Sequence, residues 1–129
     1  MTTSTAGPRG AFEITGTYNG IAVHDLDAAR TFYADTLKLD TREEYGLMWL
    51  QLPGGRDTLV YEQPTAEPAS FTILNFEVED IDALAARGVR FERYPDGEQD
   101  AKGVFRGDGP YIAWFKDPSG NVLSVLQEK

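Results

Sequence analysis

Cysteine is absent from the 129 residues, which excludes disulfides, thiolate metal sites and a cysteine nucleophile and fits a reducing compartment. The chain has one histidine, so an iron site that needs two histidines and a carboxylate is also excluded. No apolar run approaches the roughly 20 residues of a membrane-spanning helix. Lysine and arginine number only 12 against 21 acidic residues, giving a net charge of −9. This balance argues against nucleic acid as a partner and mildly favours a cationic ligand.

The length and composition fit one globular domain, with 41% hydrophobic and 26% charged residues. The first residues are small and polar and lack the apolar core of a signal peptide. The sequence therefore predicts a flexible leader over residues 1–12, a single domain over residues 13–129, and a cytoplasmic location.

A short internal repeat organises the chain. Residues 23–28, VHDLDA, recur as VEDIDA at residues 78–83, an offset of 55 residues. Asp25 and Asp80 then stand where a strand ends and a helix begins, the position of an N-cap, and Asp27 and Asp82 follow in the first helical turn. These acids are therefore predicted to be structural.

Each copy of the repeat lies between predicted strands. The expected strands cover residues 18–23, 41–45, 47–52 and 58–62 in the first half and 72–78, 90–94, 111–116 and 122–127 in the second. Residues 63–70, with two prolines, form the expected linker between module one (about 13–62) and module two (about 71–129). The glycine-rich segment 95–109 is expected to be a mobile loop.

Three segments of the chain carry a family resemblance. They are residues 23–39, VHDLDAARTFYADTLKL; residues 75–83, NFEVEDIDA; and residues 115–123, FKDPSGNVL. In this order and spacing they resemble the vicinal-oxygen-chelate superfamily of glyoxalases, bleomycin-resistance proteins and extradiol dioxygenases. The resemblance implies an α+β fold in which two βαβββ modules form an open, roughly eight-stranded barrel or cup that holds the ligand.

The resemblance also implies four positions for metal ligands in the metal-dependent relatives. They fall on Tyr18, Ile73 and Ser124, and on Val60 or, two residues on and facing the same way, Glu62. A catalytic divalent cation needs about three nitrogen, carboxylate or thiolate ligands. We therefore expect no metal and no other cofactor, and dioxygenase or glyoxalase I chemistry is disfavoured. The single histidine, His24, is expected to be an exposed loop residue.

Strand alternation selects the residues that face the cup. Tyr18, Gly20 and Ala22 are expected on the cup side of the first strand, and Asn75 and Glu77 on the cup side of the fifth. The predicted ligand-binding residues are Tyr18, Trp49, Glu62, Asn75, Tyr111, Trp114 and Ser124.

The leading hypothesis is metal-independent binding of a small, cationic or aromatic molecule, as in bleomycin-resistance proteins, by a homodimer. An alternative is a lyase or isomerase in which Glu62 or Glu77 is the catalytic residue. A further alternative is a non-catalytic interaction domain that uses the 95–109 loop as its contact surface.

Overall fold

The computed structural model describes residues 12–95 and 98–129. The predicted leader falls almost entirely outside these residues, as do two positions of the 95–109 loop. The element order is β1 (Asn19–Val23), α1 (Leu26–Arg30), a short π-helix η1 (Thr31–Thr36), β2 (Asp40–Glu44), β3 (Leu47–Leu52), β4 (Arg56–Glu62), β5 (Thr72–Glu77), α2 (Ile81–Ala86), β6 (Tyr111–Lys116) and β7 (Val122–Gln127). None of the helices in this part of the chain is long and apolar enough to cross a membrane.

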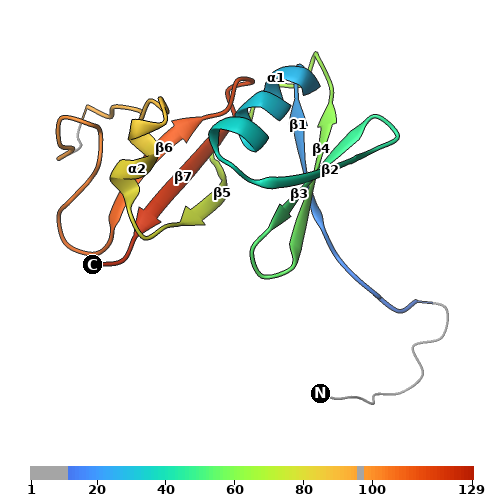
Figure 1. Cartoon of the computed structure of the whole chain (residues 1–129), viewed down its shortest axis with the longest axis horizontal. Coiled ribbons are helices and arrows are strands. Elements are labelled where there is room, and N and C mark those ends of the chain that lie inside the picture. Colours follow the sequence, from blue (N-terminus) through green and yellow to red (C-terminus); the bar gives the residue numbers. More distant parts are fainter. Residues whose placement is uncertain (1–11, 96–97) are drawn as a thin grey trace.

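The strands form two separate sheets that lie side by side along the long axis of the molecule (Figure 1). Sheet A has the order β1-β4-β3-β2 and sheet B the order β5-β7-β6. In each sheet the strand before the helix pairs in parallel with the last strand of its module, and the remaining pairs are antiparallel. This confirms the α+β fold of two related modules. The two sheets are not closed onto each other within the chain.

Both helices begin as the repeat predicts. The Asp25 side chain accepts hydrogen bonds from the backbone N–H groups of Asp27 and Ala28, at 2.9 and 3.3 Å. The Asp80 side chain accepts one from the N–H of Asp82, at 3.1 Å. These bonds satisfy donors that a helix N-terminus leaves without partners, so both aspartates are N-caps.

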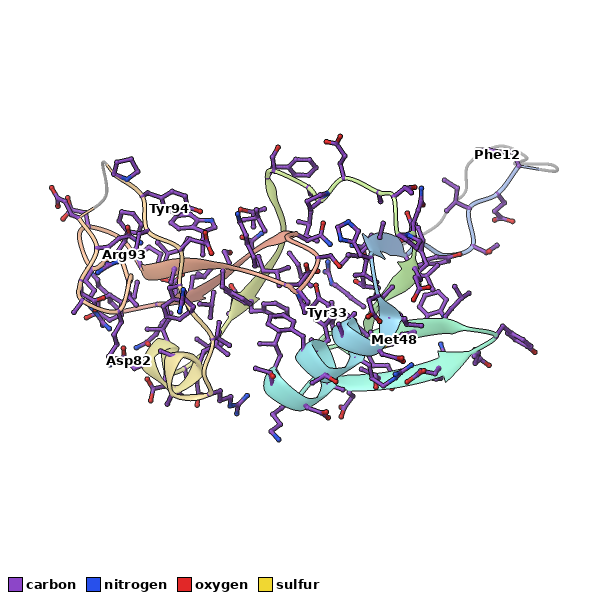
Figure 2. The ribbon with its side chains drawn as sticks, turned by 90° about the horizontal axis from the view of Figure 1, so that it is seen from above. Phe12, Tyr33, Met48, Asp82, Arg93 and Tyr94 are labelled. Atoms are coloured by element: carbon purple, nitrogen blue, oxygen red, sulfur yellow. The ribbon has the colours of Figure 1, made fainter. Side chains whose placement is uncertain are left out.

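One continuous core joins the two modules. Tyr33 of η1 and Met48 of β3, labelled in Figure 2, are fully buried on the helix side of sheet A. Phe115 of β6 is equally buried, and its ring lies 6.2 Å from that of Phe32 in η1. The π-helix therefore packs on both modules.

The strand expected at residues 90–94 is not formed as a regular strand. Glu92 donates one backbone hydrogen bond to the Trp114 carbonyl, at 2.7 Å. The side chain of Gln99 bonds the Glu92 carbonyl and the Tyr94 N–H, at 2.7 and 2.8 Å. Because Gln99 satisfies backbone groups that a ladder would use, the segment folds on itself and touches β6 at single points.

The described part of the 95–109 loop has several fixed contacts. Asp100 accepts hydrogen bonds from the N–H groups of Lys102 and Val104 and pairs with Arg106 at 2.7 Å. Burial raises the pKa of Asp100, but the Arg106 and backbone hydrogen bonds outweigh it and lower this pKa to about 2. Val104 is fully buried. The expectation of a mobile loop overlooked these contacts, which its charged residues make locally.

Candidate functional site

Each sheet has one face covered by a helix and one opposite face, which we call the open face. In sheet A the covered face carries Ile21 and Val60, which stand opposite each other in the ladder and are buried. The open face carries Gly20, Leu59 and Trp49, which are neighbours across β1, β4 and β3. The Tyr61 ring packs against Gly20, with Cε1 3.3 Å from the position that a Cβ would occupy, so the missing side chain gives room to Tyr61 and not to a ligand.

Sheet B has the same two-sided arrangement. Figure 2 shows Asp82 of α2 on one side of this sheet and Tyr94 on the other. On the open face Asn75, Ser124 and Trp114 are neighbours across β5, β7 and β6. The structure thus brings three of the predicted ligand-binding residues together.

The two open faces correspond residue by residue. Trp114 and Ser124 follow Trp49 and Leu59 by the same interval, 65 residues, and occupy the same places in the strand register. This second repeat, MWLQLPGG at residues 48–55 and AWFKDPSG at residues 113–120, was visible in the sequence and was not used in the predictions. The signal would have placed both tryptophans on equivalent faces without the structure.

Aromatic rings line the open face of sheet A. The ring of Tyr18, which is 63% exposed, lies edge-on to Trp49 with 4.8 Å between ring centroids. The Arg42 guanidinium lies over the Trp49 ring at 5.4 Å and is also paired with Glu44. This face therefore offers a flat, half-covered indole beside an exposed phenol.

The open face of sheet B is more polar and better covered. Ser124 is fully buried, and its hydroxyl donates to the side-chain oxygen of Asn75. The Trp114 indole N–H donates to the Thr72 hydroxyl at 3.1 Å. The rings of Tyr94 and Phe105 lie edge-on to Trp114, with centroids 5.8 and 5.5 Å away.

A cavity of about 600 Å³ opens beside β5. The β3–β4 hairpin contributes Arg56 to its wall, and β5 contributes Asn75 and Glu77. The other lining residues are apolar: Leu52, Pro53, Ile73, Leu74, Phe76 and Leu126. This volume is in the range of small-molecule sites in proteins.

Glu62 and Tyr111 do not lie on the open faces. Glu62 is paired with Val23 on the helix side, and its carboxylate accepts the backbone N–H of Leu26 at 2.9 Å. Glu62 was expected to bind the ligand because it faces the same way as Val60, but the pairing of Val60 with buried Ile21 puts both residues on the covered side.

Tyr111 shares the face of Ala113 and Phe115, which are buried under α2. Its ring is covered by two cations, Arg106 at 4.8 Å and Lys129 at 5.1 Å. Among the weak catalytic candidates, only Glu77 lines the cavity.

The positions that correspond to metal ligands in the expected family do not fit a divalent cation. Val60 is buried in the core, Ile73 has no donor atom, and the Ser124 hydroxyl donates to Asn75. Across residues 12–95 and 98–129, no three His, Asp or Glu side chains gather as a metal site would require. His24 is half-buried and lies elsewhere, with Nε2 2.6 Å from the Ala66 carbonyl oxygen.

The turn at residues 117–121 joins the two modules. Buried Asp117 accepts the N–H groups of Ser119 and Asn121, each at 2.9 Å, and the Tyr33 hydroxyl at 2.7 Å. Burial, together with the Asp117 carboxylate, raises the pKa of Tyr33. The Asn121 amide donates to the Ala22 carbonyl at 2.9 Å, so this turn of module two is bonded to β1 and η1 of module one.

Solved structures with this fold were compared with the chain. The antibiotic-binding protein TnmS3 from Streptomyces sp. CB03234 aligns with a TM-score of 0.65 and 23% identity, covering 92% of this chain and 99% of that one. A lactoylglutathione lyase from Agrobacterium tumefaciens aligns with a TM-score of 0.57 and 19% identity, covering 89% of this chain and 95% of that one. A glyoxylase/bleomycin resistance protein/dioxygenase domain from Frankia sp. EAN1pec aligns with a TM-score of 0.60 and 18% identity, covering 91% of this chain and 94% of that one. At these identities the likeness is one of fold.

No curated protein is significantly similar to the chain. The sequence itself matches one family over residues 14–125, nearly its whole length. That match agrees with the two related modules and with the solved structures. The chain belongs to the Glyoxalase/Bleomycin resistance protein/Dioxygenase superfamily.

Proposed function

We propose that this protein binds a small organic molecule between the open faces of its two sheets, without a metal ion. The observation that carries the proposal is the pair of tryptophans, Trp49 and Trp114, at equivalent register positions on two faces that no helix covers. An indole that is only partly covered by its own chain offers a flat apolar surface to a planar ligand. The similar fold of the antibiotic-binding protein TnmS3 also supports small-molecule binding.

The donor set supports the metal-independent form of the proposal. Tyrosine and serine hydroxyls, an isoleucine and a valine stand at the positions expected to hold a cation, and neutral hydroxyls are poor ligands for a divalent ion. Binding then depends on shape, ring stacking and the Asn75–Ser124 hydrogen-bonded pair. Glu62 caps a helix, so a lyase or isomerase alternative rests on Glu77 alone.

The proposal includes a homodimer. Within one chain the two sheets lie side by side and are not closed around a ligand. A second copy, placed so that the open face of its sheet B covers the open face of sheet A, gives each ligand two walls. Such an arrangement is isologous, because each copy gives and receives the same surface.

Intrinsic fluorescence tests the proposal directly, because the chain has only two tryptophans and both lie on open faces. Titration with bleomycin, aromatic amines and aromatic acids is expected to quench or shift the emission for at least one compound. Trp49→Phe and Trp114→Phe leave one reporter each, and each should lower affinity roughly tenfold through lost ring contact. Tyr45→Phe, at a hairpin tip that is 96% exposed, is the matched control.

Two results contradict the proposal. One is unchanged emission across the panel, confirmed by calorimetry. The other is a ligand that binds equally well to the wild type and to both tryptophan variants.

A further inference from the structure

Two side chains of opposite charge line the cavity beside β5 and have no partner. Arg56 comes from the β3–β4 hairpin and Glu77 from the end of β5. In the part of the chain that the structure describes, neither forms a hydrogen bond or an ion pair, and they do not pair with each other. Both side chains are exposed, so both charges stay hydrated until something binds.

Arg56 differs from the three arginines that are paired with carboxylates, while in the described part of the chain Arg87, Arg90 and Arg93 are also without a carboxylate partner. Arg30 is bound to Glu43 and Asp27, Arg42 is paired with Glu44, and Arg106 is paired with Asp82 and Asp100. The sequence has 21 acidic residues for 12 basic ones, so carboxylates are plentiful. A guanidinium that meets none of them and lines a cavity is available to an acidic group from outside the chain.

The rest of the cavity wall is apolar apart from Asn75. Apolar walls bind the body of a ligand, while a few polar groups fix its orientation. Here the two fixed charges are of opposite sign and come from different modules. A ligand with only a positive charge is attracted by Glu77 and repelled by Arg56. A ligand with only a negative charge is attracted by Arg56 and repelled by Glu77.

We propose that the ligand is dipolar: a carboxylate bound by Arg56, an ammonium group bound by Glu77, and an apolar body against Leu52, Ile73 and Leu126. This inference concerns the cavity beside β5 within one chain, which neither tryptophan lines, so it adds to the proposed function a site for zwitterions of the amino-acid or short-peptide type. It differs from the expectation of a cationic or aromatic ligand, which followed from the net charge and from the aromatic residues of the predicted strands. Arg56 is the specificity residue for the acidic end and Glu77 for the basic end.

A four-member probe set tests the two ends separately. The set is the dipeptide phenylalanyl-leucine, its N-acetyl form, its C-terminal amide and the doubly blocked form, titrated by calorimetry and tryptophan fluorescence. The free dipeptide is expected to bind most tightly, and each block is expected to weaken binding roughly tenfold, the loss of one charged hydrogen bond.

Substitutions then assign each end to its residue. Arg56→Gln is expected to abolish the difference between acid and amide and to leave the acetylation effect intact, and Glu77→Gln is expected to do the reverse. Arg90→Gln and Glu67→Gln remove exposed charges outside the cavity and should change neither difference. These two controls also measure any general effect of net charge.

The outcomes separate this inference from the proposed function. If aromatic probes bind but the free dipeptide does not, or if all four dipeptides bind equally, the dipolar ligand is wrong and small-molecule binding stands. If the differences persist in Arg56→Gln and Glu77→Gln, the assignment to these residues is wrong. If no probe of either panel binds, both proposals fall.

Discussion

At the residue scale, the buried carboxylate of Asp117 has the most demanding position in the molecule. It accepts two backbone N–H groups, the Tyr33 hydroxyl and the Asn121 amide, the last at 3.0 Å. A buried ion is tolerated only when its lone pairs are satisfied in this way. Among the described residues, the Tyr33 hydroxyl supplies the one hydrogen bond to this carboxylate from module one, so its removal isolates the contribution of that bond.

Tyr33→Phe is expected to lower the free energy of unfolding by about 1–3 kcal/mol at neutral pH, because a buried acceptor loses its donor. The pH dependence should change as well. Burial keeps Tyr33 protonated in the folded state, whereas the unfolded tyrosine ionises near pH 10, so stability falls as pH rises above that value. Urea unfolding from pH 8 to 11 should show this slope, up to about 1.4 kcal/mol per pH unit for Tyr33, in the wild type and a smaller slope in the variant, where burial still raises the pKa of Tyr94.

The control for this prediction is Tyr45→Phe, because Tyr45 is 96% exposed. It should reproduce the wild-type slope. A Tyr33→Phe protein with the wild-type alkaline slope would show that another buried group titrates there.

At the element scale, the first backbone N–H of each helix donates a hydrogen bond to a side chain at the end of the last strand of the same module. Glu62 at the end of β4 accepts the first N–H of α1, and Gln127 at the end of β7 accepts the N–H of Ile81, the first residue of α2, at 2.8 Å. The equivalent places are thus filled by a glutamate and a glutamine. Only the acceptor oxygen is common to the two, so the charge of Glu62 is not needed for this contact.

Glu62→Gln is therefore expected to change stability by less than about 0.5 kcal/mol, while Glu62→Ala should cost about 0.5–2 kcal/mol through the lost cap. Neither variant should alter ligand affinity or any turnover, because the side chain is on the covered side of sheet A. Thermal and urea unfolding with a fluorescence titration measure both effects. Lost turnover in Glu62→Gln with full stability would restore Glu62 as a catalytic candidate.

The same elements show what the sequence could predict. Local patterns located nearly every strand and both N-caps, because alternation and capping depend on neighbours in the chain. The face of Glu62 was predicted incorrectly because it depends on the register between β4 and β1, strands about 40 residues apart. The segment 90–94 was misjudged because the Gln99 side chain, five residues beyond it, takes its backbone bonds.

At the scale of the whole molecule, the sequence repeat predicted the strands and helix of each module. It did not predict how the two sheets are placed relative to each other. That placement is set by Phe32 and Tyr33 of η1 and by the turn at residues 117–121, contacts that no periodicity encodes. The proposed homodimer makes the placement testable.

The Trp49→Ala and Trp114→Ala variants, each measured alone as a homodimer, are expected to bind the ligand more weakly than the wild type. If every site combines sheet A of one copy with sheet B of the other, a heterodimer of the two variants has one intact site and one doubly altered site. Unfolding and refolding an equal mixture should therefore restore wild-type affinity in roughly a quarter of the sites, as counted by calorimetry. A site formed within one chain predicts no restoration, and a monomeric mass by sedimentation would also contradict the dimer.

The interval from the helix cap to the tryptophan is ten residues longer in module two than in module one, and this longer connection carries Tyr94 and Phe105, the rings that flank Trp114. Two identical modules would give a binding site with two equivalent faces, in which a ligand could bind equally well in either of two opposite orientations. The longer connection makes the two faces different, because Tyr94 and Phe105 flank Trp114, whereas Tyr18 and Arg42 flank Trp49. If a ligand binds between them as proposed, we expect it to take a single preferred orientation, which a repeated scaffold by itself does not provide.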